Sequence, residues 1–320
     1  MRIKLLIVLS ILSFWGILYQ FMPVRVYKKT VEIPYGESSL DTAIRLYREG
    51  IIRSPFSFLT IHALFRGKLE AGEYEFDGIV FPWDAYRKIR YGLRKLYKIT
   101  VPEGYDLYDI AKLLEEKKIC SSKDFLEYAL SPKTVKKYGL ATYSMEGFLF
   151  PDTYFFSKNT HPSHIVDVMF KNFMKKTAQL RQELPKKGLT LEKWVIIASM
   201  IEKETALPSE KPLVAAVIYN RIKENMKLQI DPTVIYALKR RGMWEGILTK
   251  KDLNFEDPYN TYVYYGLPPT PICNPGLDSL KAALYPANVP YLYFVADGTG
   301  KHSFSVDYQD HLRKVRLYRR

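Results

Sequence analysis

Two glutamates, Glu202 and Glu204, lie at the end of a helix predicted to run from Leu191 to Thr205. Because residues three, four and seven apart share a helical face, Glu204 continues the apolar stripe that contains Ile197, whereas Glu202 lies on another stripe. Burial disfavours the ionised form of a carboxyl group, so its pKa rises and it can hold a proton near neutral pH. A protonated carboxyl group is the acid that cleavage of a glycosidic bond requires. The pattern therefore makes Glu204 a candidate general acid.

The alternative for this helix end is a pair of solvated charges without a catalytic role. Glutamates near the C-terminus of a helix are not stabilised by the helix dipole, so two of them there are mildly unfavourable without another purpose. Spacing alone leaves both interpretations open.

Motifs for several other chemistries do not occur in the chain. It has no G-x-x-x-x-G-K-[ST] loop, no H-E-x-x-H, no G-x-S-x-G and no C-x-x-C pair. His161 and His164 have the spacing of metal ligands, but without a third partner they are expected to be surface residues. We therefore expect neither a metal nor another cofactor. Cys120 and Cys273 are too few for a disulfide scaffold, and the sequence leaves open whether they pair.

The chain is strongly basic, with a net charge of +14 and 25 tyrosines among its 320 residues. Such a charge raises nucleic acid, anionic lipid and acidic polymers as partners. The basic residues are dispersed, apart from the tail 313–320, and follow no RRM, KH or zinc-finger pattern, so we expect no nucleic-acid partner. A surface facing an anionic wall or membrane is favoured. The tyrosines would also suit sugar binding, because an aromatic ring packs on the apolar face of a pyranose.

An uncharged segment, Leu5 to Val24, is long enough to cross a bilayer as a helix. It lacks the A-x-A cleavage pattern of a signal peptide, so residues 1–24 are predicted to be an uncut transmembrane anchor with a short cytoplasmic end. Basic residues lie on both sides of the segment, so the positive-inside rule does not decide its orientation.

An internal repeat follows the predicted anchor. Val31–Gly36 followed by Leu40–Leu46 resembles Thr100–Gly104 followed by Leu107–Leu114. Each copy predicts a strand, a glycine turn and an amphipathic helix. The pattern resembles LysM modules, which bind N-acetylglucosamine polymers, and a spacer without a ligand is the alternative. We therefore predict a LysM-like region of two related units at residues 25–155.

The remaining elements predict the catalytic part of the chain. Ser209 can start a largely apolar, buried helix that ends near Lys223. Tyr291–Ala296 and His302–Val306, joined by a D-G-T-G turn, predict a β-hairpin. The chain is thus predicted to be an α+β protein: an N-terminal transmembrane helix, two LysM-like α+β units, and a catalytic domain of helices with a small sheet at residues 156–320.

Three longer segments carry a family resemblance. Ala198–Thr205, Pro212–Arg221 and Leu228–Tyr236 closely resemble the endolytic murein transglycosylases of the MltG (YceG-like) family. The likeness continues through Glu146–Tyr154, Tyr259–Tyr262, Gly266–Pro269, Asn274–Gly276, Tyr291–Ala296 and His302–Phe304. Compared with a typical member, the chain stops soon after His311, and its first LysM-like unit is less regular than its second.

The resemblance implies lytic cleavage of the β-1,4 bond between N-acetylmuramic acid (MurNAc) and N-acetylglucosamine (GlcNAc) within glycan strands, which leaves 1,6-anhydro-MurNAc ends. The family's catalytic glutamate is the second one of the E-K-E-T run, which corresponds to Glu204. It would act first as an acid on the glycosidic oxygen and then as a base on the muramic 6-hydroxyl. Since no water attacks, a second carboxylate would not be obligatory.

The resemblance also indicates substrate-binding candidates, for which turn formation is the alternative at several positions. The predicted substrate-binding residues are Glu202, Tyr219, Asn220, Gln229, Asp231, Asn260 and Tyr262. The implied partners are peptidoglycan glycan strands, the cytoplasmic membrane and peptidoglycan synthases, beside which the enzyme would end growing strands. The implied location is the cytoplasmic membrane, in a single pass, with the catalytic domain on the outer, periplasmic or extracellular, side.

Two other functions remain as alternatives. A membrane-tethered, non-catalytic glycan-binding scaffold would keep the repeats but would not need a desolvated Glu204. A muramidase that admits water would instead leave a reducing sugar at the cut.

Overall fold

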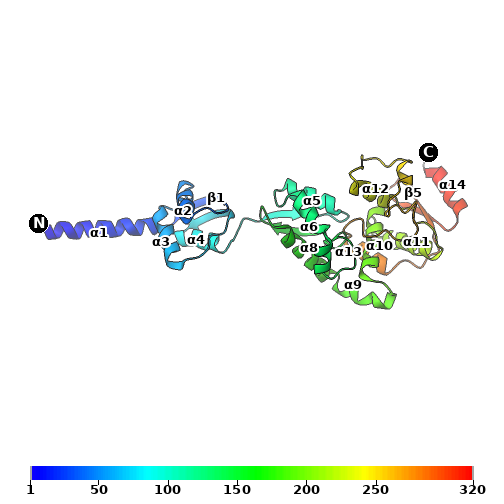
Figure 1. Cartoon of the computed structure of the whole chain (residues 1–320), viewed down its shortest axis with the longest axis horizontal. Coiled ribbons are helices and arrows are strands. Elements are labelled where there is room, and N and C mark those ends of the chain that lie inside the picture. Colours follow the sequence, from blue (N-terminus) through cyan, green and yellow to red (C-terminus); the bar gives the residue numbers. More distant parts are fainter. Residues whose placement is uncertain (1, 319–320) are drawn as a thin grey trace. The chain divides into compact units, whose positions relative to one another are not determined.

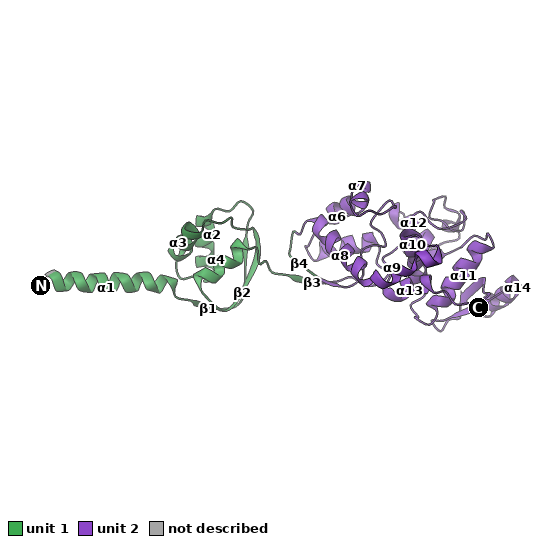
Figure 2. Cartoon of the chain, turned by 90° about the horizontal axis from the view of Figure 1, so that it is seen from below, with its two compact units in different colours: residues 1–98, 155–159 green, residues 99–154, 160–320 purple. Residues whose placement is uncertain are grey.

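The computed structural model describes residues 2–318, which form two compact units. One unit comprises Met1–Lys98 with Phe155–Asn159, and the other comprises Ile99–Tyr154 with Thr160–Arg320 (Figure 2). This is a division by packing. The boundaries predicted at residues 24 and 155 divide the chain by function and stay a prediction.

The first unit packs helices on a two-stranded antiparallel sheet (Figure 1). Its core contains Leu46, Phe58, Tyr74 and Tyr86, all with no exposed surface. The strands pair Val31 with Tyr74, and the register shifts at a bulge between Val26 and Lys29. The elements are α1 (Arg2–Phe21), β1 (Val24–Ile33), α2 (Ser39–Arg48), α3 (Pro55–Phe65), β2 (Gly72–Val80) and α4 (Pro82–Arg90).

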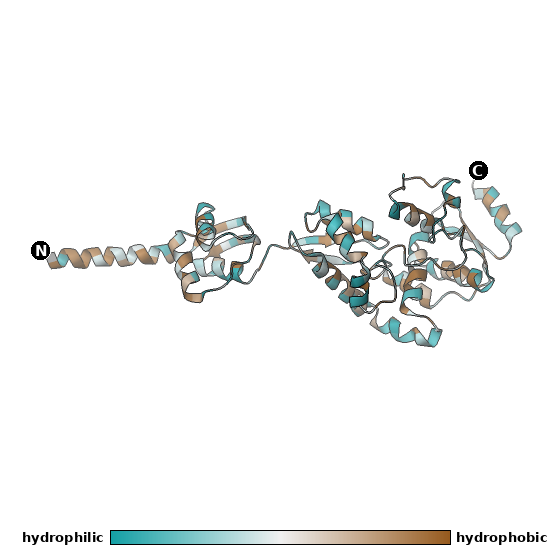
Figure 3. Cartoon of the chain, in the orientation of Figure 1, coloured by the Kyte–Doolittle hydropathy of each residue, from teal (hydrophilic) through white to brown (hydrophobic). Residues whose placement is uncertain are grey.

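Helix α1 is apolar and solvent-exposed along nearly its whole length (Figure 3). Its stretch Ile3–Phe21 is, within the described residues, the one helix long and apolar enough to cross a membrane. At its C-terminal end, the Arg53 guanidinium donates to the Tyr19 hydroxyl at 2.7 Å, and the Ser54 hydroxyl donates to Gln20 at 2.8 Å. These two bonds join the end of the helix to the start of α3.

The second βααβ segment follows the order of the first with one short extra helix before its last strand, and its first strand and helices agree with the internal repeat. It contains β3 (Tyr97–Thr100), α5 (Leu107–Glu116), α6 (Ser122–Ala129), a short α7 (Pro132–Lys137) and β4 (Thr153–Phe156), and β3 pairs with β4. The order of elements agrees with the LysM resemblance, and the identity of the two segments as LysM modules stays a prediction.

Asn274 joins this segment to the rest of the second unit. Its main-chain amide donates to Tyr105 O at 2.8 Å, and the Gly104 amide donates to Asn274 O at 3.0 Å. Its buried side chain donates to Tyr105 O at 3.0 Å and accepts from the Leu149 amide at 2.9 Å. Residues 99–154 therefore pack with the helices of residues 160–320 as one compact body.

Helix α10 (Leu191–Glu204) is central to the second unit and packs against α11 (Lys211–Lys223), α12 (Asp231–Arg240) and α13 (Leu277–Leu284) (Figure 1). Thr190 caps it as predicted, and every residue from Trp194 to Ile201 is buried. The remaining elements of the unit are α8 (Pro162–Lys176), α9 (Ala178–Glu183), η1 (Pro185–Lys187), η2 (Asp252–Asn254), β5 (Tyr293–Ala296), β6 (His302–Ser305) and α14 (Tyr308–Tyr318).

The structure confirms the predicted α+β class. The β5–β6 hairpin is antiparallel and pairs Phe294 with Phe304. The helix predicted from Ser209 begins two residues later, because Glu210 takes the capping position before Lys211. Cys120 and Cys273 are both buried and unpaired, which settles the question that the sequence left open.

Candidate active site

Glu204 is the last residue of α10 and projects from the end of a buried helix. Thr205, which is extended, ends the helix, and its amide still donates to Ile201 O at 3.2 Å. The Thr205 hydroxyl donates to Glu210 at 3.1 Å and accepts from the Leu207 amide at 3.1 Å. The backbone that carries Glu204 is therefore fixed on both sides.

The Glu204 side chain is half-buried and lines a pocket of about 340 Å³. Three of the predicted substrate-binding residues, Gln229, Asp231 and Tyr262, line the same pocket. The other lining residues come from α11, the segment before α12, the β5–β6 hairpin and α14. They are Arg221, Leu228, Phe294, Val295, Ala296, His302, His311 and Val315.

Asp231 and Tyr262 form one wall of the pocket. Asp231 is the first residue of α12, where a carboxylate is stabilised by the helix dipole, and it accepts a hydrogen bond from the Tyr262 hydroxyl. Burial and the bond to Asp231 raise the pKa of Tyr262, so its hydroxyl stays protonated. Gln229 adopts a left-handed backbone with φ of 52°, and its amide donates to Thr261 O at 3.1 Å. These bonds hold the segment before α12 against the loop that carries Tyr262.

Burial is the main cause that raises the pKa of Glu204 to about 8. The negative charge of Asp231 contributes to the rise, and the Arg221 guanidinium opposes it. Among residues 2–318, none hydrogen-bonds or ion-pairs with the Glu204 carboxyl group. It is therefore a neutral acid at pH 7 that is available to a ligand.

Arg221 is a pocket residue that the sequence reasoning missed. Its Nε donates to Leu292 O at 2.7 Å, its Nη1 donates to Leu228 O at 2.7 Å, and its guanidinium lies 5.2 Å from the Tyr293 ring centroid. Burial lowers its pKa. Arg221 ends the Pro212–Arg221 motif, which was an available signal. The sequence analysis instead selected Tyr219 and Asn220 from this motif as substrate-binding candidates.

Four of the predicted substrate-binding residues lie outside the pocket. The side chains of three of them are engaged with main-chain carbonyl groups, and their role in substrate binding stays a prediction. Tyr219 donates to Ala283 O at 2.7 Å, Asn220 to Val289 O and Tyr291 O at 2.9 Å each, and Asn260 to Leu253 O at 3.0 Å and Phe255 O at 2.8 Å.

Glu202 also lies outside the pocket, on the other stripe of α10. It accepts from Lys211 Nζ at 3.2 Å, from the Gly276 amide at 3.0 Å and from the Ser279 hydroxyl at 2.6 Å. The Lys211 and Glu202 side chains are 4% and 7% exposed, respectively. Glu202 therefore links α10, α11 and α13 in the interior, and a substrate-binding role for it stays a prediction.

The pKa of Glu204 predicts a specific pH dependence. If Glu204 is the general acid that the resemblance implies, kcat/KM should fall as pH rises through about 8. In Asp231→Asn, the loss of a neighbouring negative charge should lower this pKa and move the decline to a lower pH. The Tyr262 hydroxyl can still donate to the amide oxygen. Cleavage rates measured at subsaturating glycan between pH 5 and 10 provide the test, and an unmoved alkaline limb would contradict the assignment.

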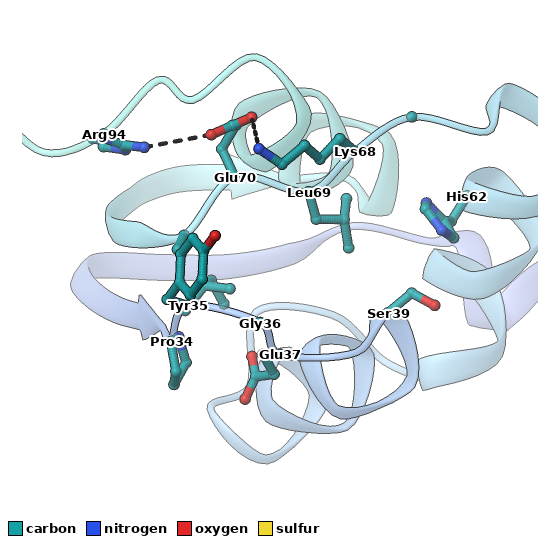
Figure 4. Close-up of a pocket in the computed structure, with 13 residues that line it drawn as sticks. Pro34, Tyr35, Gly36, Glu37, Ser39, His62, Lys68, Leu69, Glu70 and Arg94 are labelled. Atoms are coloured by element: carbon teal, nitrogen blue, oxygen red, sulfur yellow. Dashed lines mark ion pairs between the residues drawn. The ribbon is translucent and has the colours of Figure 1, made fainter.

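A second pocket, of about 460 Å³, lies in the first unit (Figure 4). It is formed by the loop after β1, the loop before β2, and two side chains from elsewhere, His62 and Arg94. Glu70 forms ion pairs with Lys68 at 3.4 Å and with Arg94 at 3.5 Å. The Tyr35 side chain is almost fully exposed. The pocket thus combines an exposed aromatic ring with charged and apolar groups.

The fold and the pocket place a carboxyl group with a raised pKa, Glu204, at the end of a buried helix, where it is suited to acid–base chemistry. The chain belongs to the YceG-like family, whose sequence model matches residues 31–317. This finding confirms the resemblance seen in the sequence.

Individual relatives agree with the family assignment. The endolytic murein transglycosylase of Bacillus subtilis (strain 168) is 31% identical over 92% of this chain and 87% of its own length. That of Streptococcus pneumoniae serotype 2 is 28% identical, and the match covers 98% of this chain but 64% of the relative. A crystal structure of a YceG-like protein from Listeria monocytogenes matches with a TM-score of 0.62 and 34% identity, over 89% of this chain and 98% of that one.

Proposed function

We propose that the protein is an endolytic peptidoglycan lytic transglycosylase, a lyase that cuts the MurNAc–GlcNAc β-1,4 bond within glycan strands. The observation that carries the proposal is the Glu204 carboxyl group, which lines a pocket, has no hydrogen-bond or ion-pair partner among residues 2–318, and has a pKa raised to about 8. The names of the relatives, endolytic murein transglycosylases, support the choice of polymer.

In the proposed reaction, Glu204 serves as acid and then as base. It gives its proton to the bridging oxygen while the bond from that oxygen to C1 of MurNAc breaks. The resulting carboxylate takes the proton from the 6-hydroxyl as O6 bonds to C1. The new bond closes the 1,6-anhydro ring, and Glu204 regains its proton without water being consumed.

The other charged groups of the pocket suit the transition state. Positive charge develops at C1 as the glycosidic bond breaks, and the Asp231 carboxylate supplies a negative charge within the same pocket. The Tyr262 hydroxyl holds Asp231 in place.

The presence of two carboxyl groups in one pocket also favours a second candidate, a muramidase that admits water. In hydrolytic glycosidases, a pair of carboxyl groups activates water or forms a covalent intermediate. Glu204 and Asp231 could form such a pair. The chemical nature of the new sugar end distinguishes the two reactions.

We further propose that α1 anchors the enzyme in the cytoplasmic membrane with the catalytic unit on the outer side, where peptidoglycan is built. An enzyme held there would meet nascent strands and could terminate their elongation beside peptidoglycan synthases. The apolar length of α1 supports the anchor. The pocket with Tyr35 in the first unit offers a place where that unit would hold glycan, as its LysM resemblance implies.

Mass spectrometry of the fragments that the detergent-solubilised full chain releases from purified peptidoglycan tests the proposal. Internal fragments that end in anhydro-MurNAc are expected, each lighter by one water than the reducing sugar. Reducing ends would show a hydrolase. Glycan retention without any released fragment would instead favour the non-catalytic scaffold.

A further inference from the structure

His302 lies in the Glu204 pocket, and its ring is held by a buried carboxylate. Its Nδ1 lies 2.8 Å from Glu210 Oε2, and its own amide donates to Glu210 Oε1 at 2.9 Å. Both oxygens of one carboxylate thus hold the same residue, and the two side chains are only 14% and 9% exposed. The orientation of the imidazole is therefore fixed.

The contacts of Glu210 also fix the tautomer of this ring. Burial opposes ionisation of Glu210, but hydrogen bonds from the amide and ring of His302 and from Thr205 outweigh it, so the pKa of Glu210 is lowered. A carboxylate can only accept, so Nδ1 of a neutral imidazole must carry the proton. Nε2 then carries the lone pair.

The opposite side of the ring remains available to a ligand. Among residues 2–318, none hydrogen-bonds to His302 Nε2, and the ring packs edge-on against Phe294 with centroids 5.4 Å apart. Phe294 lines the same pocket. Glu210 also accepts a hydrogen bond from Thr205, the residue next to Glu204. One carboxylate therefore holds both the end of the helix that carries Glu204 and the imidazole of His302.

We propose that His302 contacts the substrate: its Nε2 accepts a hydrogen bond from a hydroxyl or acetamido N–H of the glycan, and Glu210 sets the tautomer that makes this possible. The inference rests on the proposed function, since it takes glycan as the ligand of the pocket. It adds an acceptor of fixed orientation to the acid Glu204. Glu210 does not reach the substrate and is a positioning residue.

His302→Asn is the main test, because the asparagine amide nitrogen can take the place of Nδ1 and keep the bond to Glu210 while Nε2 is lost. The full chain carrying Glu204→Gln provides a background in which cleavage is expected to be slow, so glycan binding is read with little turnover. There, we expect His302→Asn to weaken binding of purified glycan strands about five- to tenfold, the range of one hydrogen bond. The thermal midpoint should stay unchanged.

Glu210→Gln is the second test, because the glutamine amide can donate to Nδ1 and so turns Nε2 into a donor. The same loss of binding is expected where the partner is an acetamido N–H, which can only donate, whereas a sugar hydroxyl could turn and accept from Nε2–H. The hydrogen-bonded link between residues 210 and 302 is kept in either case. If the His302–Glu210 pair had only a structural role, both variants would bind glycan as tightly as the Glu204→Gln background. His161→Gln is a matched control, since its ring lies outside the pocket and bonds to Ser163.

The outcomes separate this inference from the proposed function. If both variants bind glycan as tightly as the Glu204→Gln background, His302 is not a substrate contact, even when the wild type cuts. If the wild type releases no fragments but the variants still bind more weakly, the proposed reaction fails and the contact stands. If the Glu204→Gln background binds no glycan at all, the inference is overturned.

Discussion

Glu204→Gln is expected to lower kcat for glycan cleavage by about 10²- to 10⁴-fold, because an amide cannot serve as the acid and then as the base. The fold should not suffer. A carboxyl group whose pKa is raised to about 8 in the folded protein costs stability as pH rises above its ordinary value of 4.5, since the folded state favours the proton. At pH 7 the neutral glutamine should therefore be at least as stable as the wild type.

Fragment release and thermal unfolding, measured on the same preparation, check this prediction. Glu224→Gln is the matched control: it makes the same change at an exposed position at the end of α11 and should leave both quantities unchanged. Near-wild-type activity of Glu204→Gln would show that Glu204 is not the general acid. Asp231 would then be the next candidate.

Lys211→Met should produce the largest loss of stability, about 3–5 kcal/mol in the free energy of unfolding. The methionine fills a similar volume but leaves the Glu202 carboxylate buried and without its cation. Two hydrogen bonds, from the Gly276 amide and the Ser279 hydroxyl, remain and cannot replace the positive charge. Urea unfolding followed by circular dichroism measures the loss.

The double variant Glu202→Gln/Lys211→Met is the control for this prediction. The glutamine oxygen can still accept from Gly276 and Ser279, and no buried charge remains, so most of the lost stability should return. A single-variant loss below about 1 kcal/mol would instead match a solvent-exposed pair.

The periodicity of residues 191–205 was sufficient to predict a helix and to place its two terminal glutamates on different faces. The D-G-T-G turn was sufficient for the β5–β6 hairpin. Both signals are local: helical period and turn chemistry depend on neighbours in the chain, and a sequence displays those neighbours directly.

The remaining pocket residues depend on contacts far apart in the sequence. Arg221 and Asn220 are adjacent, but successive helical residues point in different directions, so one lines the pocket while the other bonds to Val289 and Tyr291. The partner of His302 is Glu210, 92 positions away. A motif indicates that such residues occur together, but it does not show which of them reach a ligand.

The contact between Tyr105 and Asn274, 169 positions apart, also bears on how the catalytic unit is made. A chain leaves the ribosome from its N-terminus, so the second βααβ segment is synthesised long before the residue that closes it onto α10. Such long-range closure slows folding, because the entropy of a large loop is lost before the contact is gained. During biogenesis the catalytic unit must therefore stay incomplete until its C-terminal third has emerged, whereas the first unit needs only residues up to 159.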